Sequence, residues 1–537
     1  MPQDECVQNH SSLRRAFIFC VLCLAIFQFS ENTTDPDLWG HVIYGSHLLQ
    51  TGTLMRADPY SWTANGHPWI NHEILAEAAM ALSFRALGGP GLLLLTVAVG
   101  LLTFFLALAT ASAGMVPGRT RIVAWALGAL AVVEISYGFA VRPQIFTALA
   151  LAAELWILRR IHEGRLRWAF ALPPLFAAWI NTHGGVVAGI LLLFAAAGAT
   201  TAQCIFNRFN LDVVRLEKPP AKIVPVLWIA CAFSAAALFL NPYGAGLIRW
   251  LSGSVSWLRP QITEWNPVSL GWNHAAFFFC AALAAVALLL SPRRRQLWEA
   301  AVLVLLAAAA FRSVRNTPLF CIAALALAPP GLAGVLERFE NRFANLTAVF
   351  ARSLAQKFLT LLLCVASAGI LAATAFLHKQ RAWTMEVPRN QYPVAAIQFI
   401  RARDLRGNLL VFFDWGEICL WELPRSRVSM DGRLDTCYPR RLITAHWRFY
   451  NAEPFDTNVL DLRRADFALL PSHLAGSMAL AKMDDWRPVY FDNLAVVLVK
   501  NLNQFPKLAG LPLPIRGRPA ATRGRAAFPN HLPQRRE

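Results

Sequence analysis

Long apolar runs recur along residues 16–377, and short polar stretches separate them. A perpendicular helix needs about 20 apolar residues to cross a bilayer, and these runs reach or approach that length, with ends uncertain by a few residues. The pattern predicts a polytopic α-helical membrane protein with about eleven transmembrane helices, at residues 16–30, 90–113, 122–140, 143–158, 168–182, 184–205, 223–240, 274–291, 297–311, 317–333 and 358–377.

The first apolar run follows Arg14 and Arg15, an arrangement that is also typical of a secretory signal peptide. No small-x-small cleavage site comes after it, because the chain continues Gln28-Phe29-Ser30-Glu31. We therefore expect the first run to stay in the protein as a transmembrane helix.

The first polar segment, residues 31–74, is long enough to form an outer loop. Residues 75–87 have an amphipathic pattern and are expected to form a helix along the membrane surface. Gly88-Gly89-Pro90-Gly91 then breaks that helix before the second span. Residues 1–377 are thus expected to form the transmembrane module, with 31–87 as its first outer loop.

Residues 378–502 are predicted to form a separate α/β domain. Strand-like apolar runs lie at Leu409–Phe413, Arg427–Met430, Phe467–Leu470 and Leu494–Val499, and helical patterns such as Val394–Arg403 and Arg440–Tyr450 alternate with them. This alternation indicates a layered α/β fold without a glycine-rich phosphate loop. Residues 503–537 are rich in Pro, Gly and Arg, a composition that predicts disorder.

Composition agrees with a membrane protein. Hydrophobic residues make up 56% of the chain and charged residues only 15%, against about 25% charged in soluble domains. The formal net charge of +18 does not indicate nucleic-acid binding, because the basic residues cluster in short loops such as Arg293-Arg294-Arg295 and in the C-terminal tail. The positive-inside rule then places the N-terminus in the cytoplasm and residues 378–537 outside.

The cysteines carry little functional signal. Seven lie in or beside apolar runs, where cysteine acts as a small hydrophobic residue: Cys20, Cys23, Cys204, Cys231, Cys280, Cys321 and Cys364. The Cys20-x-x-Cys23 pair falls inside a helix and is interpreted as packed or lipid-facing. Cys419 and Cys437 share the C-terminal domain and could form a disulfide in an oxidising compartment.

Unusual polar residues collect at the turns that this orientation places outside. They are Asp35, Asp37, Glu73, Arg142-Pro143, Asn181-Thr182-His183-Gly184, Asn241-Pro242-Tyr243-Gly244, Arg312 and Arg315. Each has a plain structural alternative, as a helix cap, a helix end, an interfacial histidine or a snorkelling arginine. Together they are expected to line one cavity at the outer membrane face. Glu134 and Glu154 lie within spans and receive no role.

Several of these segments resemble the GT-C superfamily of membrane glycosyltransferases. The resemblance rests on Asp35-Pro-Asp37-Leu-Trp39-Gly-His41, Gly52 to Ser61, Gly66-His-Pro-Trp69-Ile-Asn-His-Glu73, Arg142-Pro-Gln144, Trp179 to Gly184, Asn241-Pro-Tyr-Gly244, Arg312-Ser-Val-Arg315-Asn-Thr-Pro318, Asp414-Trp-Gly416 and Asp431-Gly-Arg433. The chain is similar to poorly characterised bacterial members of this superfamily, and more distantly to protein mannosyltransferases and aminoarabinose transferase. The resemblance implies an inner-membrane enzyme with a polyprenyl-phosphate sugar donor, an inverting transfer and an acidic first-loop base.

The resemblance also implies roles for the polar residues. Asp37 is favoured as the base, and Asp35 is its rival. Arg312, Arg315, Arg142 and His183 are expected to bind the donor phosphate, since arginine can bond two phosphate oxygens. Glu73, Trp39, His41, Asn241 and Tyr243 are expected to contact the sugar or acceptor. A divalent cation such as Mg or Mn is an open possibility, with Asp35, Asp37 and Glu73 as its ligands.

Two other functions stay open from the sequence. The first is a transporter or flippase for a lipid-linked or anionic solute. Transporters usually show inverted repeats and polar residues at the bilayer midplane, whereas this chain shows no clear repeat and gathers its polar residues at one face. The second is a non-catalytic family member that binds a sugar or a partner. The sugar, the lipid, the acceptor and the oligomeric state do not follow from the sequence.

Overall fold

The computed structural model describes residues 2–112, 119–209, 216–255, 261–342, 353–380, 383–517 and 525–533. The chain divides into two compact units. The first comprises residues 1–31 and 94–380, and the second comprises residues 32–93 and 381–537. The first outer loop thus belongs with the C-terminal domain, which differs from the boundaries expected from the order of segments along the chain.

The first unit is a helix bundle. Its elements, with α4 beginning in the second unit, are α1 (Pro2–Phe29), α4 (Gly89–Ser112), α5 (Arg119–Tyr137), α6 (Gln144–His162), α7 (Leu172–Ile180), α8 (Val186–Arg208), α9 (Ile223–Ala237), α10 (Ala245–Val255), α11 (Ala275–Leu290), α12 (Leu297–Arg312), α13 (Thr317–Leu327), α14 (Pro329–Arg342) and α16 (Ser353–Gln380), with 3-10 turns η1 (Leu166–Ala171), η2 (Thr263–Trp265), η3 (Trp272–His274) and η4 (Val314–Asn316).

Each apolar run identified in the sequence lies on helix for most of its described length, so the polytopic helical architecture is confirmed. Within the described residues, six helices are long and apolar enough to cross a membrane, and a seventh crossing is possible if α13 and the start of α14, bent by 55°, act as one span. The remaining apolar helices, including α7 with its preceding 3-10 turn and α9, are shorter than 18 residues or fail on composition. The expected number of eleven spans stays a prediction.

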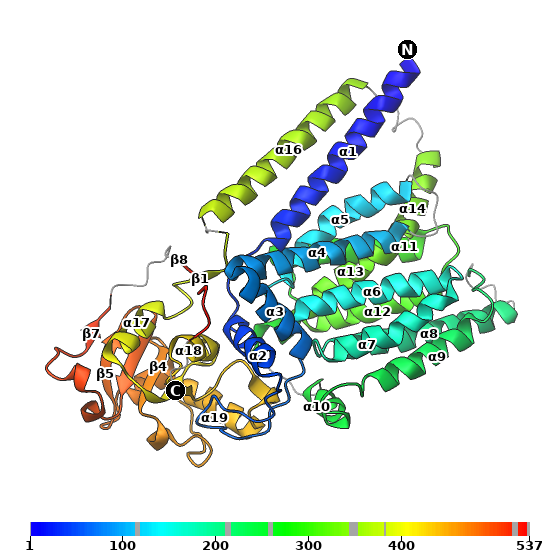
Figure 1. Ribbon diagram of the computed structural model, residues 1–537. Helices are drawn as coiled ribbons and strands as arrows, with labels where there is room; N and C mark the ends of the chain where they lie inside the picture. The colour runs from blue at the N-terminus through cyan, green and yellow to red at the C-terminus, as the bar shows by residue number, and fades with distance from the viewer. Residues whose placement is uncertain are drawn as a thin grey trace. The chain divides into compact units, whose positions relative to one another are not determined.

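Close packing of the bundle depends on small residues that face aromatic rings. A Cβ on Gly100 of α4 would lie 2.5 Å from the ring of Phe29 in α1, and one on Gly189 of α8 would lie 2.4 Å from the ring of Trp179 in α7. Glycine therefore lets these helices approach closely, as in other membrane bundles. Figure 1 shows α1 and α16 running side by side along one edge of the bundle.

The second unit combines two helices of the first outer loop with an α/β domain. Its elements are α2 (Leu38–Thr51), α3 (Ile74–Leu87), β1 (Glu386–Pro388), α17 (Val394–Arg403), β2 (Gly407–Val411), η5 (Phe413–Trp415), α18 (Gly416–Glu422), β3 (Ser426–Val428), η6 (Leu434–Thr436), α19 (Arg440–Tyr450), η7 (Leu462–Arg464), β4 (Phe467–Pro471), α20 (Ala475–Leu480), β5 (Arg487–Phe491), β6 (Ala495–Val499), η8 (Leu502–Gln504), η9 (Pro506–Leu508), β7 (Ile515–Arg516) and β8 (Arg525–Ala527).

A six-stranded mixed sheet forms the centre of this domain, in the order β3-β2-β4-β6-β5-β7. Strand β2 pairs in parallel with β3 and β4, whereas β6 is antiparallel to β4 and β5. Every residue of β4 is buried, as expected of a central strand covered on both faces. The helices expected at Val394–Arg403 and Arg440–Tyr450 are present as α17 and α19.

The first outer loop is joined to this domain through backbone pairing. Ser61 bridges to Val428, the last residue of β3, and Thr33 bridges to Glu386 in β1. The Trp62 indole N–H also donates to the Leu409 carbonyl of β2 at 3.0 Å. These bonds join first-loop residues to both sheets of the domain, which is consistent with residues 32–93 forming one compact unit with the C-terminal domain.

Two features of the C-terminal region, the tail and a cysteine pair, were left to the structure or differ from the expectation in the described residues. The tail expected to be disordered adds strand β7 to the sheet and strand β8 to β1, and Phe528 is buried against Trp39 and Phe84. A few apolar positions thus anchor a segment whose composition is otherwise typical of disorder. Cys419 and Cys437 are both buried and free, so they do not form a disulfide.

Candidate functional site

Asp35 and Asp37 have different surroundings at the start of α2. The Asp35 carboxylate accepts a hydrogen bond from the Asp37 backbone N–H at 3.0 Å, so it closes the turn that leads into the helix. Asp37 is the N-cap residue of α2, yet its side chain makes no capping hydrogen bond. The Asp35 carboxylate is therefore used in the turn before α2, whereas the Asp37 carboxylate is oriented toward residues outside its own helix.

The Asp37 carboxylate faces the turn that follows β3. A Cβ on Gly432 would lie 2.0 Å from Asp37 Oδ1 and 3.1 Å from Glu417 Oε1. A side chain at this position would displace the Asp37 carboxylate, because real Cβ atoms do not approach other atoms that closely. The Asp431-Gly432-Arg433 segment singled out in the sequence thus forms the wall opposite Asp37.

Arg433 is the cationic centre of this wall. Its guanidinium bonds both oxygens of Asp431, at 2.8 and 2.7 Å, and its Nη1 lies 2.8 Å from Asp58 Oδ1. The Arg433 side chain is only 3% exposed and those of both aspartates are fully buried. The charge is further surrounded by four aromatic rings, of Tyr44, Tyr60, Trp69 and Tyr438. The network joins the first outer loop to the C-terminal domain around one charge.

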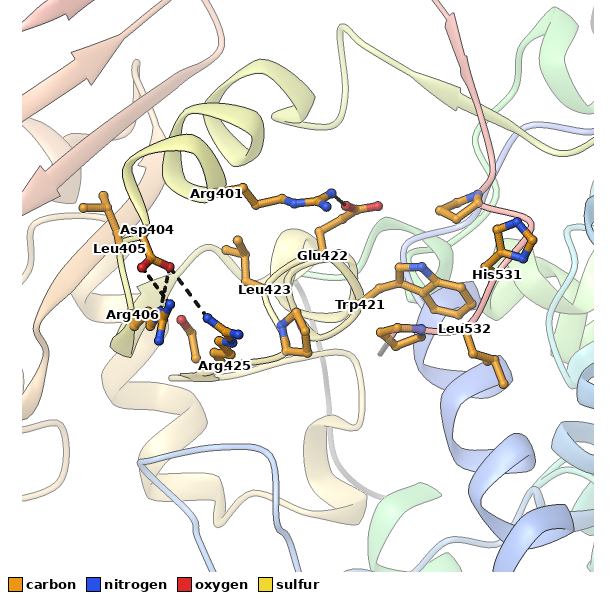
Figure 2. A pocket seen from close by; sticks show the side chains of 14 residues that line it. Arg401, Asp404, Leu405, Arg406, Trp421, Glu422, Leu423, Arg425, His531 and Leu532 are labelled. Carbon is orange, nitrogen blue, oxygen red and sulfur yellow. Dashed lines mark hydrogen bonds and ion pairs between the residues drawn. The ribbon is translucent and has the colours of Figure 1, made fainter. Parts of the chain in front are cut away.

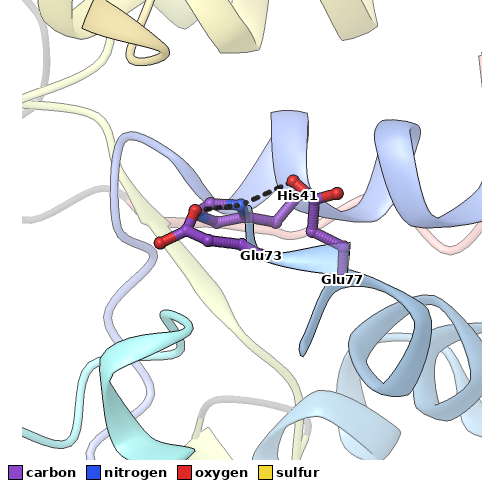
Figure 3. A group of neighbouring side chains, drawn as sticks. All are labelled: His41, Glu73 and Glu77. Carbon is purple, nitrogen blue, oxygen red and sulfur yellow. Dashed lines mark hydrogen bonds and ion pairs between the residues drawn. The ribbon is translucent and has the colours of Figure 1, made fainter. Parts of the chain in front are cut away.

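His41, Glu73 and Glu77 form a second polar group in the same unit, shown in Figure 3. His41 Nδ1 lies 3.4 Å from Glu77 Oε1 and 3.9 Å from Glu73 Oε2. Burial lowers the pKa of His41, but the hydrogen bond to Glu77 and the charge of Glu73 outweigh this and raise it to about 9. In the described part of the chain, neither Asp35 nor Asp37 belongs to this group, so the expected ligand set of Asp35, Asp37 and Glu73 is not gathered in one place.

The geometry of this second group suits a divalent metal ion. Ligand atoms 2.0–2.2 Å from one metal stand roughly 3.2–3.5 Å apart in a tetrahedral site, and the three donor atoms already lie within 4.8 Å of one another. Asn71 supports Glu77 through a bond of 2.6 Å, and His72 Nε2 lies 3.9 Å from the other oxygen of Glu73. Such outer contacts orient metal ligands.

Trp39 lies in the core of the second unit. It is fully buried and packs against the rings of Tyr392 and Phe528, with centroids 4.9 and 5.5 Å away. The apolar side chain next to the candidate base thus holds α2 against the C-terminal domain. This position favours a packing role over the expected contact with a sugar.

In the first unit, the charges of Arg142 and Arg315 both act on Glu264, an acidic residue that the sequence did not single out. Arg142 Nη1 forms an ion pair of 2.6 Å with Glu264 Oε1, and the Arg315 guanidinium stacks 4.4 Å above the ring of Trp265. Burial alone would raise the pKa of Glu264, but the charges of Arg142 and Arg315 hold it below its usual range. Ser313 fixes this turn by donating to the Glu264 carbonyl at 2.9 Å.

His183 has a defined tautomer in this arrangement. Its Nδ1 accepts a hydrogen bond from the Gly185 backbone N–H at 3.1 Å and lies 2.9 Å from Thr147 Oγ1. The indole of Trp179 donates to the same hydroxyl at 2.9 Å. Because Nδ1 is an acceptor, a neutral His183 carries its proton on Nε2 and is a donor at that atom.

Asn241 builds the turn after α9. Its side-chain amide donates to the carbonyls of Leu238 and Gly244, and its oxygen accepts from the Tyr243 backbone N–H at 2.8 Å. Asn181 also donates to the Leu240 carbonyl, so two turns at the same end of the bundle are joined. Asn241 is thus used in the turn itself, and Tyr243, which is half-buried, follows from it. Arg312 is exposed at the last turn of α12.

Glu134 and Glu154, which received no role from the sequence, are both buried. Glu134 accepts a hydrogen bond from Thr317 and lies 2.9 Å from His274 Nδ1, so α5, α13 and the start of α11 share a polar contact. Both oxygens of Glu154 are without a hydrogen-bond partner among the described residues. A buried acid without a partner is costly within a membrane bundle.

The second unit also carries a groove of about 470 Å³ between α17, α18 and residues 529–533, shown in Figure 2. Arg401 pairs with Glu422 at 2.6 Å, and Arg406 and Arg425 contact Asp404 at 2.6 and 3.9 Å. Each arginine of the groove thus has an acidic partner. None of the residues expected to act on a substrate lines it.

No protein-family model and no curated protein matches the sequence. Solved structures do match it. The apo structure of ArnT from Cupriavidus metallidurans aligns with 92% of this chain and 98% of its own length, at 13% identity and a TM-score of 0.54. The same protein bound to undecaprenyl phosphate aligns over the same shares at 14% identity and a TM-score of 0.50. The apo oligosaccharyltransferase of Archaeoglobus fulgidus aligns with 86% of this chain and 69% of its own length, at 13% identity and a TM-score of 0.52.

The chain has the fold of ArnT and of the archaeal oligosaccharyltransferase, the two glycosyltransferase structures that it matches. The expected fold is thereby confirmed over most of the chain, including the α/β region. The identities of 13–14% carry the architecture alone, and the roles of individual residues come from their positions. Three residues that the sequence interpretation missed, Glu77, Glu264 and Glu417, all bond residues distant along the chain or across a turn. Only the neighbouring motifs around Gly416 and Gly432 signalled where Glu417 would matter.

Proposed function

We propose that this protein is an integral membrane glycosyltransferase that moves a sugar from a polyprenyl-phosphate donor to an acceptor hydroxyl at the extracytoplasmic face. The likeness in fold to ArnT and to an archaeal oligosaccharyltransferase supports the class of reaction. One of these neighbours was solved with undecaprenyl phosphate and another with a dolichol phosphate, which supports a lipid-linked donor. The loop charges support an extracytoplasmic second unit, and the resemblance in sequence to bacterial members of the GT-C superfamily supports an inner-membrane location.

The observation that carries the proposal is the position of Asp37. Its carboxylate makes no cap bond to its own helix and faces a wall shaped by Gly432. As the base, Asp37 would accept the proton of the acceptor hydroxyl while the acceptor oxygen bonds to the anomeric carbon. The bond from this carbon to the phosphate oxygen breaks, and its electron pair leaves with the phosphate. Attack opposite the leaving group inverts the anomeric centre.

Cationic residues of the first unit would stabilise the phosphate that leaves. Arg142 pairs with the Glu264 carboxylate at 2.6 Å, and the charge of Arg315 also acts on this carboxylate, which supports an anion site at this turn. His183 Nε2 adds a hydrogen-bond donor in the same unit. We assign donor-phosphate binding to Arg142, Arg315 and His183, with Arg312 at the exposed end of α12 as a further contact.

A divalent cation would be held by His41, Glu73 and Glu77. Imidazole nitrogen together with two carboxylates suits Zn or Mn better than Mg, which prefers oxygen ligands. When bound, the ion would act as a Lewis acid toward an oxygen of the sugar or phosphate. Without it, His41 and Glu77 form a hydrogen-bonded pair that fixes α2 against α3.

The test uses the full-length protein in lipid nanodiscs and a panel of undecaprenyl-phosphate-linked hexoses. Binding of each donor is measured first, and release of undecaprenyl phosphate is then followed with candidate acceptors. Asp37→Asn should bind donor as wild type does but lose turnover by roughly 100-fold or more. The matched control Asp35→Asn should keep most of its turnover, because Asp35 acts on the turn.

The arginines give the second arm of the same experiment. Arg315→Ala should weaken donor binding by about 10-fold or more, the value of one lost charge-assisted hydrogen bond. If no donor binds to a preparation shown to be folded, the transferase proposal fails. Solute flux assays would then test the transporter reading. If Asp37→Asn keeps wild-type turnover, Asp37 is not the base.

A further inference from the structure

Glu417 is a buried carboxyl group to which the proposed reaction gives no task. It is the second residue of α18 and is 2% exposed. Its Oε2 accepts a hydrogen bond from the Gly40 backbone N–H at 2.8 Å, and its Oε1 accepts one from the Tyr44 hydroxyl at 3.4 Å. Both partners lie on α2, so a residue of the C-terminal domain bonds the helix that begins beside Asp37.

The bond to Gly40 replaces a cap that Asp37 would normally supply. In most helices the N-cap side chain accepts from the second or third backbone N–H of the helix. Gly40 is the third residue of α2, and Asp37 is the N-cap but makes no such bond. Glu417 takes this donor instead. The end of α2 is therefore satisfied without the carboxylate of Asp37.

Glu417 and Asp37 also face the same point. The oxygens Glu417 Oε1 and Asp37 Oδ1 both lie close to the position that a Cβ on Gly432 would take, at 3.1 and 2.0 Å. The two oxygens cannot be further apart than the sum of these distances. A Cβ on Gly40 would lie 2.1 Å from Glu417 Oε2. Glycines on both sides thus allow the two carboxyl groups to approach.

The charges around Glu417 favour its neutral form. Burial raises its pKa well above the usual range, and the negative charges of Asp37 and Asp431 raise it further. The charge of Arg433 and the bond from Gly40 oppose this shift. Arg433 is already bonded to Asp431 and paired with Asp58. Two carboxyl groups in one buried site usually share a single negative charge.

We propose that Glu417 is a positioning residue for Asp37. It caps α2 in place of Asp37, and as a neutral carboxylic acid it presents its O–H toward the Asp37 carboxylate. The negative charge of the pair then stays on Asp37, where the reaction needs a base. This inference rests on the proposed function, in which Asp37 accepts the proton of the acceptor.

The first test compares Glu417→Gln with Glu417→Ala in the undecaprenyl-phosphate release assay. Glutamine can accept from Gly40 through its oxygen and donate toward Asp37 through its amide, so Glu417→Gln should keep kcat within about threefold of wild type. Glu417→Ala should lower kcat by about 10-fold or more at nearly unchanged KM. It should also move the acidic limb of the kcat/KM profile to higher pH, because a donor to the base is lost.

A second measurement does not depend on turnover. A carboxyl group whose folded pKa is raised above the unfolded value of 4.5 takes up a proton on folding, so its contribution to stability falls as pH rises above about 4.5. Glutamine cannot ionise. The unfolding temperature of Glu417→Gln should therefore rise relative to that of wild type as the pH increases from 5 to 8. Glu422→Gln is the control, because Glu422 lies on the same helix but is paired with the exposed Arg401. Its difference in unfolding temperature from wild type should stay constant between pH 5 and pH 8.

The outcomes separate the two proposals. If no donor binds to the folded protein, the proposed function fails, and if Asp37→Asn is active, Asp37 is not the base and needs no positioning residue. If Asp37→Asn is inactive while Glu417→Ala keeps both its kcat and its acidic limb, the positioning role is overturned. A stability difference for Glu417→Gln that stays flat from pH 5 to pH 8 also overturns it, because Glu417 would then be ionised. Rescue by glutamine and not by alanine supports it.

Discussion

Replacing Arg433 should unfold the second unit far more readily than replacing an arginine at its surface. Arg433 is 3% exposed at its side chain and lies within 2.8 Å of two fully buried aspartates. Arg433→Met would leave both carboxylates in the interior without their cation. Removing one partner of a buried ion pair costs about 3–5 kcal/mol.

The second unit contains roughly 220 residues, those of the segments 32–93 and 381–537. For a unit of this size, 1 kcal/mol shifts the unfolding temperature by about 2–4 °C, so Arg433→Met should lower it by roughly 6–20 °C. Arg401→Met is the matched control. Arg401 pairs with Glu422 at 2.6 Å but its side chain is 60% exposed, so its loss should cost less than about 1 kcal/mol.

The assay can be made specific for this unit. Cys419 and Cys437 are free thiols, each 1% exposed in the second unit. In a background that keeps only these two cysteines, a thiol-reactive dye reports the opening of this unit on heating. The unfolding temperature of Arg433→Lys should lie between those of Arg433→Met and Arg401→Met. Lysine keeps the positive charge, but its ammonium cannot bond two oxygens of Asp431 as the planar guanidinium does. Equal shifts for Arg433→Met and Arg401→Met would refute the reasoning.

Three further predictions follow from the same contacts. Gly432→Ala should lower turnover at least 10-fold, because its Cβ would lie 2.0 Å from Asp37 Oδ1. The control Gly198→Ala has nothing within 4 Å of its Cβ and should leave the rate of undecaprenyl-phosphate release unchanged. Asn241→Ala should lower the free energy of unfolding by about 1 kcal/mol, because the Asn241 side chain closes the turn after α9. The KM for the donor should stay unchanged, and a raised KM would instead support the expected contact of Asn241 with the sugar. Glu154→Leu should leave the unfolding temperature of the first unit unchanged or raise it, because both Glu154 oxygens are without hydrogen-bond partners among the described residues. A marked drop in the unfolding temperature would contradict this and indicate that the Glu154 carboxyl group makes a stabilising contact.

Features that depend on local pattern were predictable from the sequence. Apolar runs fixed the helices of the bundle, since periodicity and length are read directly from the chain. The helices at Val394–Arg403 and Arg440–Tyr450 agree with α17 and α19 to the residue. Strands β2, β3, β4 and β6 were placed within a few residues, whereas β5, which contains Pro488, and the short β1, β7 and β8 were missed. Proline and short length weaken the strand pattern.

The candidate site was predictable only in part because its contacts join distant segments. The sequence marked Asp37, Asp35 and the segment Asp431-Gly432-Arg433, but the bond from Gly40 to Glu417 spans 377 positions. Nothing local distinguishes Glu417 from Glu422 at the end of the same short helix. Helix α2 itself was missed, since it lies in a segment interpreted as a polar loop, and its apolar side chains are buried against the C-terminal domain.

The joining of residues 32–93 with residues 381–537 constrains how the chain is threaded through the bilayer. Two segments that share one sheet must lie on the same side of the membrane, so the chain between them crosses an even number of times. Within the described residues, five helices after residue 88 meet the full length and hydropathy test for a span. If all five of these helices cross, at least one shorter or bent helix must cross as well, because five is odd. The ten spans expected after the first loop have the required parity, and accessibility tags near residues 54 and 453 should always report the same compartment.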